Sequence, residues 1–391
     1  MKYSYLGKTG MKVPVLSFGA SSLGGVFHSV REAEAIRAVF TAVENGMNFI
    51  DVSPYYGHTK AETVLGKALT ELQRESFLLS TKVGRYGADG VNTWDYSARR
   101  TRESVFESME RLHVDYIDLI NVHDIEFADL SQVVDETLPT LMELREKGLV
   151  GHVGITDLQL ENLKWVIDHV PEGTVESVLN FCHYTLNDDK LVDFLDYFEE
   201  KGVGVINASP FAMGLLSQRG VPEWHPAPAA LVEACRKASD YCLSQGYPIE
   251  KLAIQYSVSN PRIGTTLFSS ANPDNVLKNI QYIEEPIDWD LVAKVKEIIG
   301  EQKVTGVVLE DAAVIDVNGV FVAYGAVPQT DLLKKFAVLD DSGYVRAGET
   351  GETALEGLYV AGDARTKKLR QVVTAVSDGA NAATAVAEYL K

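Results

Sequence analysis

Eight short apolar segments recur between residues 15 and 270, and longer stretches with helical spacing separate them. The stretch REAEAIRAVFTAVENG (31–46) is typical of these connections, since it is amphipathic and ends in glycine, a common helix stop. Strands that alternate with helices predict βαβ units and a parallel sheet. Eight units in about 290 residues predict a (β/α)8 TIM barrel. The expected strands are 15–21, 48–53, 77–83, 117–123, 150–156, 177–183, 203–209 and 265–270.

An open, doubly wound sheet is the competing fold. That fold normally carries a glycine-rich fingerprint after its first strand, and SFGASSLGG (17–25) matches the fingerprint poorly. Ahead of the first strand, SYLGKTGMKVP (4–14) indicates a small hairpin that turns at Lys8-Thr9-Gly10.

From residue 301 onward the pattern changes. The segment 305–328 alternates as strands do, with turn signals at Asp311 and Asn318-Gly319. A further strand is expected at GLYVAGDA (357–364), followed by an alanine-rich helix over 369–390. We therefore expect a barrel over 1–300, a boundary near 301–304, and a separate α/β segment over 304–391.

The net charge and the cysteine content of the chain indicate which binding partners and which cellular compartment to expect. The net charge of −19 disfavours nucleic acid and anionic membranes as partners. No apolar run approaches the roughly 18 residues that a membrane helix needs, and the N-terminus lacks the apolar region of a signal peptide. Three cysteines without a CxxC pair form no disulfide framework, which is typical of a cytoplasmic protein. No metal site is expected.

Four polar residues lie at or just after the ends of expected strands, where a (β/α)8 barrel places its chemistry. Asp51, Lys82 and His123 lie at the ends of the second, third and fourth strands, and Tyr56 lies in the loop after the second. Taken singly, each has an ordinary explanation, such as a helix cap, a solvated lysine or packing. Because these strands are neighbours in a barrel, the four side chains can converge, and the joint arrangement predicts acid–base chemistry.

The four residue types suggest individual roles. A phenol has a pKa near 10, and a nearby ammonium such as Lys82 lowers it, while Asp51 keeps Lys82 charged. A neutral His123 can hydrogen-bond the substrate oxygen. Tyr56 would then be the acid for carbonyl reduction or the base for alcohol oxidation. The missing reactant is a hydride carrier, which implies a nicotinamide cofactor.

Residues 1–300 resemble the aldo-keto reductase family, whose Asp, Tyr, Lys and His tetrad matches the four residues above. Seven stretches in order resemble the plant-type L-galactose dehydrogenases of that family: LGKTGMKVPVLSFGASSLGGVF, DVSPYYG, TKVGRYG, VHDIEF, HYTLND, ASPFAMGLL and PEWHPA. The resemblance implies a (β/α)8 barrel with the nicotinamide across its C-terminal mouth. The cofactor contacts that it implies are Gly19, Ala20, Ser21, Asp51, Thr156, Asp157, Asn180, Phe181, Ala208, Ser209, Pro210, Met213, Gly214, Leu216, Ser269, Ser270, Asn275 and Asn279.

Three of these positions depart from the family pattern. Asp157 stands in place of an amide, Phe181 in place of a glutamine, and Ala208 in place of a stacking tyrosine. The nicotinamide is therefore expected to be held somewhat differently.

The stretch LFSSANPDNVLKN (267–279) aligns with the segment that binds the 2'-phosphate in NADPH-using members, which place Lys or Arg at the positions of Ser269 and Asn275. Both residues are neutral here, so a dianionic phosphate would lack its charge-assisted hydrogen bonds. NAD is therefore expected rather than NADP. A role of the same segment as a helix start, with Asn272 or Asp274 as its cap, is compatible with this.

NAD use suggests oxidation. For an L-galactose-like aldose, the alcohol would be the anomeric hydroxyl and the product a lactone. Tyr55, His123 and Trp224 are the expected substrate contacts, although ordinary loop packing explains Trp224 equally well. A general NAD(P)H-dependent aldehyde or ketone reductase and a non-catalytic binding protein on the same barrel are the alternatives.

Residues 304–391 resemble the C-terminal part of low-molecular-weight thioredoxin reductases, in VNGVFVAYGAVPQTDLL, LEGLYVAGDA and LRQVVTAVSDGANAATAVAEYL. The resemblance implies a partial FAD-domain-like segment, in which Asp363 matches a flavin ribityl contact and Arg370-Gln371 match residues near the flavin ring. FAD is not expected, because the chain lacks a GxGxxG start and a redox CxxC.

A half-domain of this kind leaves strand edges unpaired, so we expect it to pack on the barrel or on another copy of the chain, forming a homo-oligomer. A docking module that completes a flavoprotein in trans is the alternative.

Overall fold

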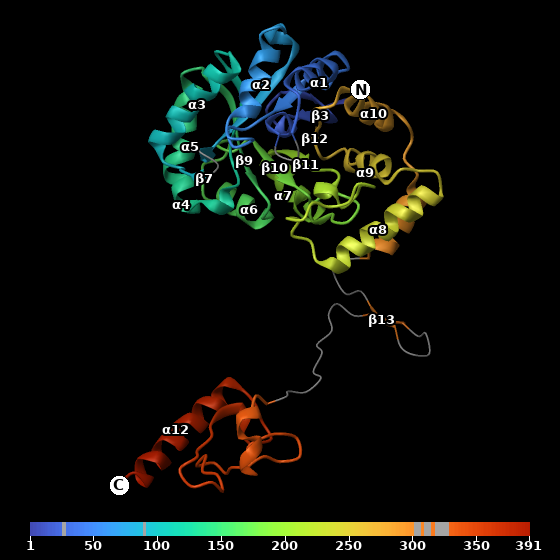
Figure 1. Cartoon of the computed structure of the whole chain (residues 1–391). Coiled ribbons are helices and arrows are strands. Elements are labelled where there is room, and N and C mark those ends of the chain that lie inside the picture. Colours follow the sequence, from blue (N-terminus) through green and yellow to red (C-terminus); the bar gives the residue numbers. More distant parts are fainter. Residues whose placement is uncertain (26–28, 89–90, 301–305, 309–313, 317–327) are drawn as a thin grey trace. The chain divides into compact units, whose positions relative to one another are not determined.

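The computed structural model describes residues 1–25, 29–88, 91–300, 306–308, 314–316 and 328–391 (Figure 1). These residues form two compact units, Met1–Lys303 and Val304–Lys391, which are described separately below.

A closed barrel of eight strands forms the first unit, in the order β10-β11-β12-β3-β4-β5-β8-β9. Every neighbouring pair is parallel, including β12 with β3, which closes the barrel. All eight expected strands are present, so the barrel is confirmed and the open sheet is wrong. The strands are β3 (Leu16–Gly19), β4 (Phe49–Asp51), β5 (Leu78–Val83), β8 (Ile117–Val122), β9 (Val150–Asp157), β10 (Ser177–Phe181), β11 (Gly204–Ala208) and β12 (Thr265–Ser269).

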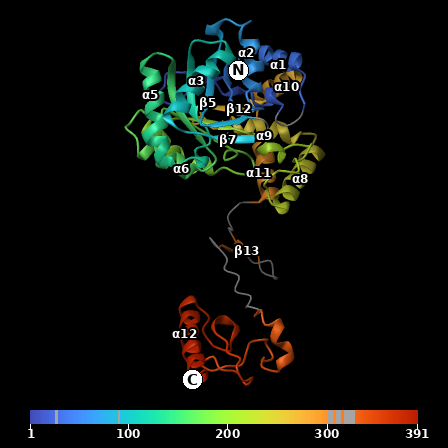
Figure 2. The same ribbon diagram turned by 60° about the vertical axis from the view of Figure 1, so that its left-hand side comes forward.

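Helices surround the barrel (Figures 1 and 2). In α1 the buried residues Ala35, Ala38, Val39 and Ala42 repeat at the spacing of one helical face, which packs against the strands. The N-terminus of α3 is capped by Ser97, whose side chain accepts a hydrogen bond from Arg100 N. The helices are α1 (Glu32–Glu44), α2 (Lys60–Leu69), α3 (Ala98–Leu112), α4 (Leu130–Gln132), α5 (Leu138–Glu146), α6 (Leu160–Asp168), α7 (Leu195–Lys201), α8 (Ala229–Ser244), α9 (Ile249–Ser257), α10 (Pro273–Glu284) and α11 (Trp289–Ile299).

The predicted N-terminal hairpin is present as β1 (Tyr3–Tyr5) and β2 (Lys12–Pro14), and it lies against the N-terminal ends of barrel strands. Leu6 in its turn is fully buried, and a Cβ added to Gly204 would lie 2.7 Å from Leu6 Cγ. Leu6 also joins the cluster that fills the barrel interior. The hairpin therefore closes this end of the barrel.

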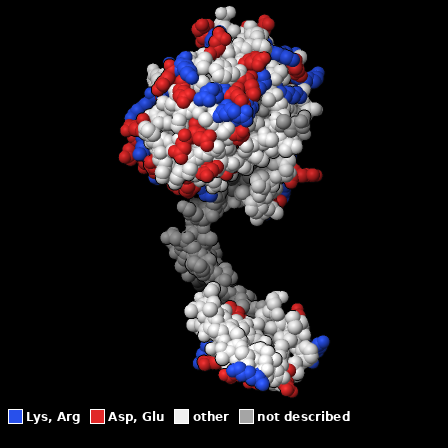
Figure 3. Space-filling model, turned by 90° about the vertical axis from the view of Figure 1, so that its left-hand side faces the viewer, with Lys and Arg blue, Asp and Glu red and all other residues white. Residues whose placement is uncertain are grey.

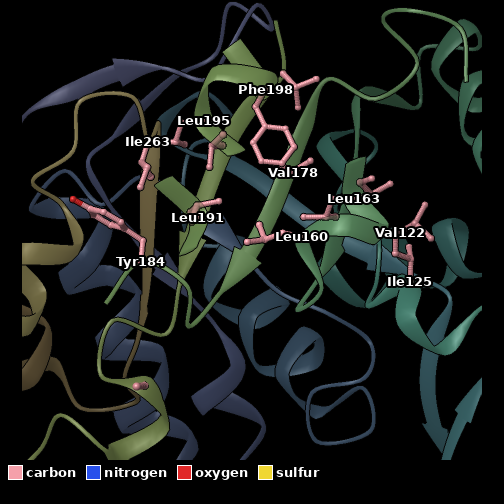
Figure 4. Packing of buried hydrophobic residues seen from close by; sticks show 14 of the residues in the cluster. Val122, Ile125, Leu160, Leu163, Val178, Tyr184, Leu191, Leu195, Phe198 and Ile263 are labelled. Carbon is pink, nitrogen blue, oxygen red and sulfur yellow. The ribbon is translucent and has the colours of Figure 1, made fainter. Parts of the chain in front are cut away.

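A larger apolar layer lies between the strands and the outer helices. Figure 4 shows part of it, where Leu191, Leu195 and Phe198 pack beside Val178 of β10. Burying each such side chain contributes roughly 1.5–3 kcal/mol relative to leaving it exposed. This layer holds the strand ends in fixed positions.

A second hairpin, β6 (Arg85–Ala88) with β7 (Val91–Trp94), follows β5 at the C-terminal side of the barrel. It was not predicted. The Asp89-Gly90 dipeptide in the sequence is a strong hairpin-turn signal that could have indicated it.

The second unit contains two short antiparallel strands, β13 (Gly306–Val308) and β14 (Val314–Asp316), and the long helix α12 (Val372–Tyr389). The predicted helix is confirmed, although it begins three residues later than expected. Arg365 donates hydrogen bonds to both carboxylate oxygens of Asp378 on α12, at 2.8 and 2.7 Å, and so ties the preceding loop to the helix.

The strand predicted over 357–364 is wrong. Tyr359 forms a single bridge with Glu352, and Gly362–Ala364 form a turn of 3-10 helix. A strand needs a neighbour along its length, and this segment finds only isolated bridges among the described residues. The strands and turns expected over 317–327 and at Asp311 lie outside the described residues.

Figure 3 shows how charged side chains are arranged on one face of the barrel unit. On the face shown in Figure 3, acidic and basic groups alternate, so the excess of acidic residues forms no single large patch there. Among the described residues, no helix combines the length and the apolar character that a membrane span requires.

Candidate active site

A cleft of about 1140 Å3 opens at the C-terminal ends of the barrel strands. Asp51 at the end of β4, Lys82 near the end of β5 and His123 just after β8 all line it, together with Tyr56 from the loop after β4. Neighbouring parallel strands bring these residues together from distant parts of the chain. The predicted convergence of the four side chains is therefore present.

Lys82 and Asp51 form a buried ion pair. The Lys82 ammonium donates to Asp51 Oδ2 and to the carbonyl oxygen of Val52, the latter at 2.8 Å. Ser80 donates to the other carboxylate oxygen of Asp51 at 2.9 Å. Burial lowers the pKa of Lys82, but Asp51 and Tyr56 beside it together outweigh burial and raise the pKa above its usual range. The ammonium is thus charged at neutral pH.

Tyr56 lies beside this ion pair. Its ring centre is 4.9 Å from Lys82 Nζ and 5.6 Å from the centre of the His123 ring, which meets it edge to face. Burial raises the pKa of Tyr56 to about 12, although Lys82 opposes this. The sequence argument expected the ammonium to lower the phenol pKa. Lys82 does lower the pKa of Tyr56, as expected, but burial raises it by more. The phenol is therefore protonated at neutral pH.

His123 is held in one orientation. Its Nδ1 lies 3.0 Å from Ser53 Oγ, and its backbone N–H donates to Val83 O at 2.8 Å. Burial lowers the pKa of His123 to about 3, so the imidazole is neutral, as the sequence argument required. A neutral imidazole can hydrogen-bond a substrate oxygen, and it adds no second positive charge beside Lys82.

Most of the residues expected to contact cofactor or substrate line the same cleft. Besides the tetrad, they are Gly19, Ser21, Tyr55, Thr156, Phe181, Ala208, Ser209, Pro210, Met213, Gly214, Trp224, Ser269, Ser270, Asn275 and Asn279. Four expected residues do not line it, and their side chains are fully buried: Ala20, Asp157, Asn180 and Leu216.

Asp157 is turned toward the helix that follows it. Its carboxylate accepts from Gln159 N at 2.8 Å and from Asn162 Nδ2 at 3.0 Å, and burial together with Glu126 raises its pKa to about 8. Asn180 donates to Asp157 O at 2.8 Å, while its Oδ1 has no hydrogen-bond partner among the described residues.

At the far end of the cleft, Ser269 binds the turn after β3. Its hydroxyl accepts from Ser22 N at 2.9 Å and donates to Ser22 Oγ at 2.7 Å. Asn272 caps α10 through a 2.8 Å hydrogen bond from Asp274 N, which confirms the first of the two expected caps. The sequence argument missed three cations that also line the cleft, Arg31, Arg219 and Lys278.

A charged pair beside the tetrad was also not predicted from the sequence. Arg85, the first residue of β6, forms an ion pair with Asp124, and its Nη2 donates to Tyr55 OH at 2.9 Å. Asp124 Oδ2 lies 3.6 Å from His123 Nε2. Arg85 and Asp124 directly follow barrel strands, and that position was the available signal.

A parallel (β/α)8 barrel with a phenol, a neutral imidazole and a buried ammonium–carboxylate pair at the mouth of a large cleft defines a barrel enzyme built for acid–base chemistry on a small polar substrate. Residues 15–300 match the aldo/keto reductase family. The chain belongs to that family.

The relatives include enzymes that act on sugars. L-galactose dehydrogenase from Arabidopsis thaliana is 45% identical over 300 residues, which cover 75% of this chain and 93% of that protein. D-arabinose 1-dehydrogenase from Saccharomyces cerevisiae is 34% identical over 229 residues, which cover 56% of this chain and 67% of that protein. An aldo-keto reductase from Bacillus halodurans, solved in its holo form, superposes with a TM-score of 0.65 at 27% identity, covering 76% of this chain and 96% of that one.

Residues 278–379 match a second family, described as pyridine nucleotide-disulphide oxidoreductase. The C-terminal segment therefore has a different origin from the barrel, as its resemblance to part of thioredoxin reductase implied.

Proposed function

We propose that the barrel is an NAD-dependent dehydrogenase that oxidises the anomeric hydroxyl of an aldose to a lactone, with Tyr56 as the proton-transferring group. The observation that carries this proposal is the convergence of Tyr56, Lys82 and His123 at one cleft, in a chain whose relatives include an L-galactose dehydrogenase and a D-arabinose 1-dehydrogenase. The L-galactose dehydrogenase relative suggests an L-galactose-like substrate.

The cleft fits a nicotinamide dinucleotide. Its volume is ample, and Arg219 and Lys278 supply positive charge that can balance a diphosphate. Asn180 precedes Phe181 of the cleft lining, and its buried Oδ1 has no hydrogen-bond partner among the described residues. When bound, the nicotinamide supplies the hydride acceptor of the reaction.

Residues of the protein itself transfer the proton of the substrate hydroxyl. Tyr56 takes the proton of the substrate hydroxyl, and Lys82, charged by Asp51, stabilises the phenolate that this step requires. Neutral His123 hydrogen-bonds the same substrate oxygen and orients it toward the phenol. Because the pKa of Tyr56 is raised to about 12, oxidation by this site is favoured at alkaline pH.

The neutral pair Ser269 and Asn275, which lines the cleft, supports the proposal of NAD rather than NADP. Lys278 and Arg219 line the same cleft and are the cations that could receive a 2'-phosphate instead. Initial rates with NAD and NADP at equal concentration test the preference, and at least tenfold higher kcat/KM with NAD is expected. Equal values with the two dinucleotides would contradict it.

Carbonyl reduction is the second candidate, because a phenol that is protonated at neutral pH is ready to act as an acid. A panel of aldoses with oxidised dinucleotide, run beside a panel of aldehydes with reduced dinucleotide, separates the two functions. Aldose oxidation with lactone formation supports the first proposal. Aldehyde reduction alone supports the second, and absence of both in the presence of dinucleotide binding supports a binding protein.

We further propose a cytoplasmic protein that forms oligomers through its C-terminal unit. Val372, Val373 and Val376 of α12 are exposed at the spacing of one helical face, and Leu369 is exposed just before the helix, which supports burial against another surface. Light scattering of the full chain and of Val372→Asp tests this, and the substitution is expected to reduce the measured mass. A monomeric full chain would contradict it.

A further inference from the structure

Arg85 and Asp124 lie at the cleft beside the tetrad, and neither has a role in the chemistry described above. Their side chains are 17% and 7% exposed, so the pair is mostly withdrawn from water. Each lies just beyond the end of a barrel strand, as the tetrad residues do. The question is whether the pair holds the fold together or meets the substrate.

The hydrogen bonds of Arg85 favour contact with the substrate. Its hydrogen-bond partners Asp124 and Tyr55 both line the cleft, and among the described residues Arg85 donates to no backbone carbonyl. A guanidinium has five N–H donors, and Arg85 Nε has no hydrogen-bond partner among the described residues. Arg85 therefore has donors beyond those that bind Asp124 and Tyr55.

A second arginine–aspartate pair, next to the same strands β5 and β8, makes different contacts. Arg74 precedes β5 and pairs with Asp118 near the start of β8, at the opposite end of the barrel. Arg74 also donates to the carbonyl oxygens of Phe77 and Tyr116, at 3.0 and 3.1 Å. Arg74 therefore holds backbone segments together. Arg85 instead donates its hydrogen bonds to side chains that line the cleft.

The pair at the cleft is held rigidly. The guanidinium of Arg85 lies 3.8 Å from the centre of the Tyr55 ring and 4.7 Å from that of Phe127. Asp124 Oδ1 accepts from Thr156 Oγ1 at 3.0 Å, and the backbone of Asp124 has a φ of 45°, a conformation that is costly for a residue other than glycine. A local strain of this kind at a cleft is typical of a residue placed for function.

From these contacts we infer that Arg85 and Asp124 recognise the hydroxyl groups of a polyhydroxylated substrate next to the carbon that reacts. A planar donor fork beside a carboxylate acceptor matches neighbouring hydroxyls, each of which both donates and accepts. Asp124 lies 3.6 Å from His123 Nε2, so the recognised hydroxyls would be close to the reacting oxygen. The inference rests on the proposed function, because it assigns the substrate class of the same site.

The test compares two aldehydes with the same three-carbon skeleton, glyceraldehyde and propanal, reduced by the protein with reduced dinucleotide. Only glyceraldehyde carries hydroxyls, so the ratio of the two kcat/KM values measures hydroxyl recognition. In Arg85→Met and Asp124→Asn the ratio is expected to fall by roughly 10- to 100-fold, as a lost hydrogen bond to a charged group would cause. The kcat/KM for propanal is expected to fall less than that for glyceraldehyde in each variant, because propanal has no hydroxyl to lose.

Arg74→Met is the matched control, and its ratio is expected to equal that of wild type even if the protein is less stable. Arg85→Lys keeps the charge beside Asp124 but loses the planar fork, so it carries the same test if Arg85→Met does not fold. An unchanged ratio in the Arg85 and Asp124 variants overturns the inference, and so does an equal fall for both aldehydes. Because both are reductions, the result is independent of whether wild type oxidises an aldose, which alone decides the proposed function.

Discussion

The ammonium of Lys82 lies 4.9 Å from the centre of the Tyr56 ring while it is hydrogen-bonded to Asp51 behind it. The carboxylate thus fixes a positive charge next to the phenol without touching the phenol itself. This arrangement separates two tasks, since Asp51 keeps the lysine charged and Lys82 acts on Tyr56, the proposed proton-transferring group.

Replacing Tyr56 by Phe removes the proton acceptor and leaves the ring. We expect kcat to fall on the order of 10²- to 10⁴-fold, because that is the usual contribution of a positioned acid or base. Steady-state kinetics measures this, with far-UV circular dichroism to show that the fold is kept. Tyr5→Phe, at an exposed position, is the control and should be fully active. Activity within twofold of wild type in Tyr56→Phe would remove Tyr56 from the mechanism.

Replacing Lys82 by Met leaves the Asp51 carboxylate buried without its partner. Breaking a buried pair in this way costs about 3–5 kcal/mol in the free energy of unfolding. Urea denaturation should show that loss, and the double variant Asp51→Asn/Lys82→Met should recover much of it while remaining inactive. If the double variant is no more stable than the single one, the pair is not the cause of the loss.

The pH dependence of stability should report the buried imidazole. The pKa of His123 is lowered to about 3 in the folded chain, whereas an unfolded histidine titrates near 6.5. Between these values the unfolded state binds more protons, so stability is lost as pH falls below about 6.5. The difference in unfolding free energy between wild type and His123→Asn is therefore expected to shrink from pH 7 to pH 4.5. A difference that stays constant over this range would contradict a neutral, buried His123.

The turn that carries Tyr56 depends on a close approach between two glycines. Gly57 has a φ of +62°, and a Cβ added to it would lie 2.3 Å from Gly24 O. We expect Gly57→Ala to lower both stability and kcat, since the added methyl must displace the backbone next to Tyr56. Gly148→Ala is the control, because Gly148 has a φ of +72° but nothing within 4 Å of an added Cβ. Equal effects of the two substitutions would show that the backbone angle, rather than the contact, is responsible.

Local pattern was enough to predict the eight strands and the convergence of Asp51, Tyr56, Lys82 and His123. Both depend on short apolar runs and on residues placed directly after them, which the sequence displays. The pKa of Tyr56 was not predictable in the same way, because it depends on how deeply the ring is buried by residues far away in the chain.

The pair Arg85 and Asp124 was missed because each residue alone resembles an ordinary charged loop position. Arg85 lies just after β5 and Asp124 just after the neighbouring strand β8, and the pairing of these strands brings the two side chains together. The strand expected over 357–364 failed for the opposite reason: its local pattern is strand-like, but the described part of the second unit offers it no neighbour along its length.

The turn of the N-terminal hairpin, with Leu6 seated against Gly204, shuts the far side of the barrel. Under the proposed function, dinucleotide and sugar would share the cleft at the opposite, C-terminal ends of the strands. The ligand that lies deeper there would be held until the other has left, so the proposed dehydrogenase would bind and release its two ligands in a fixed order.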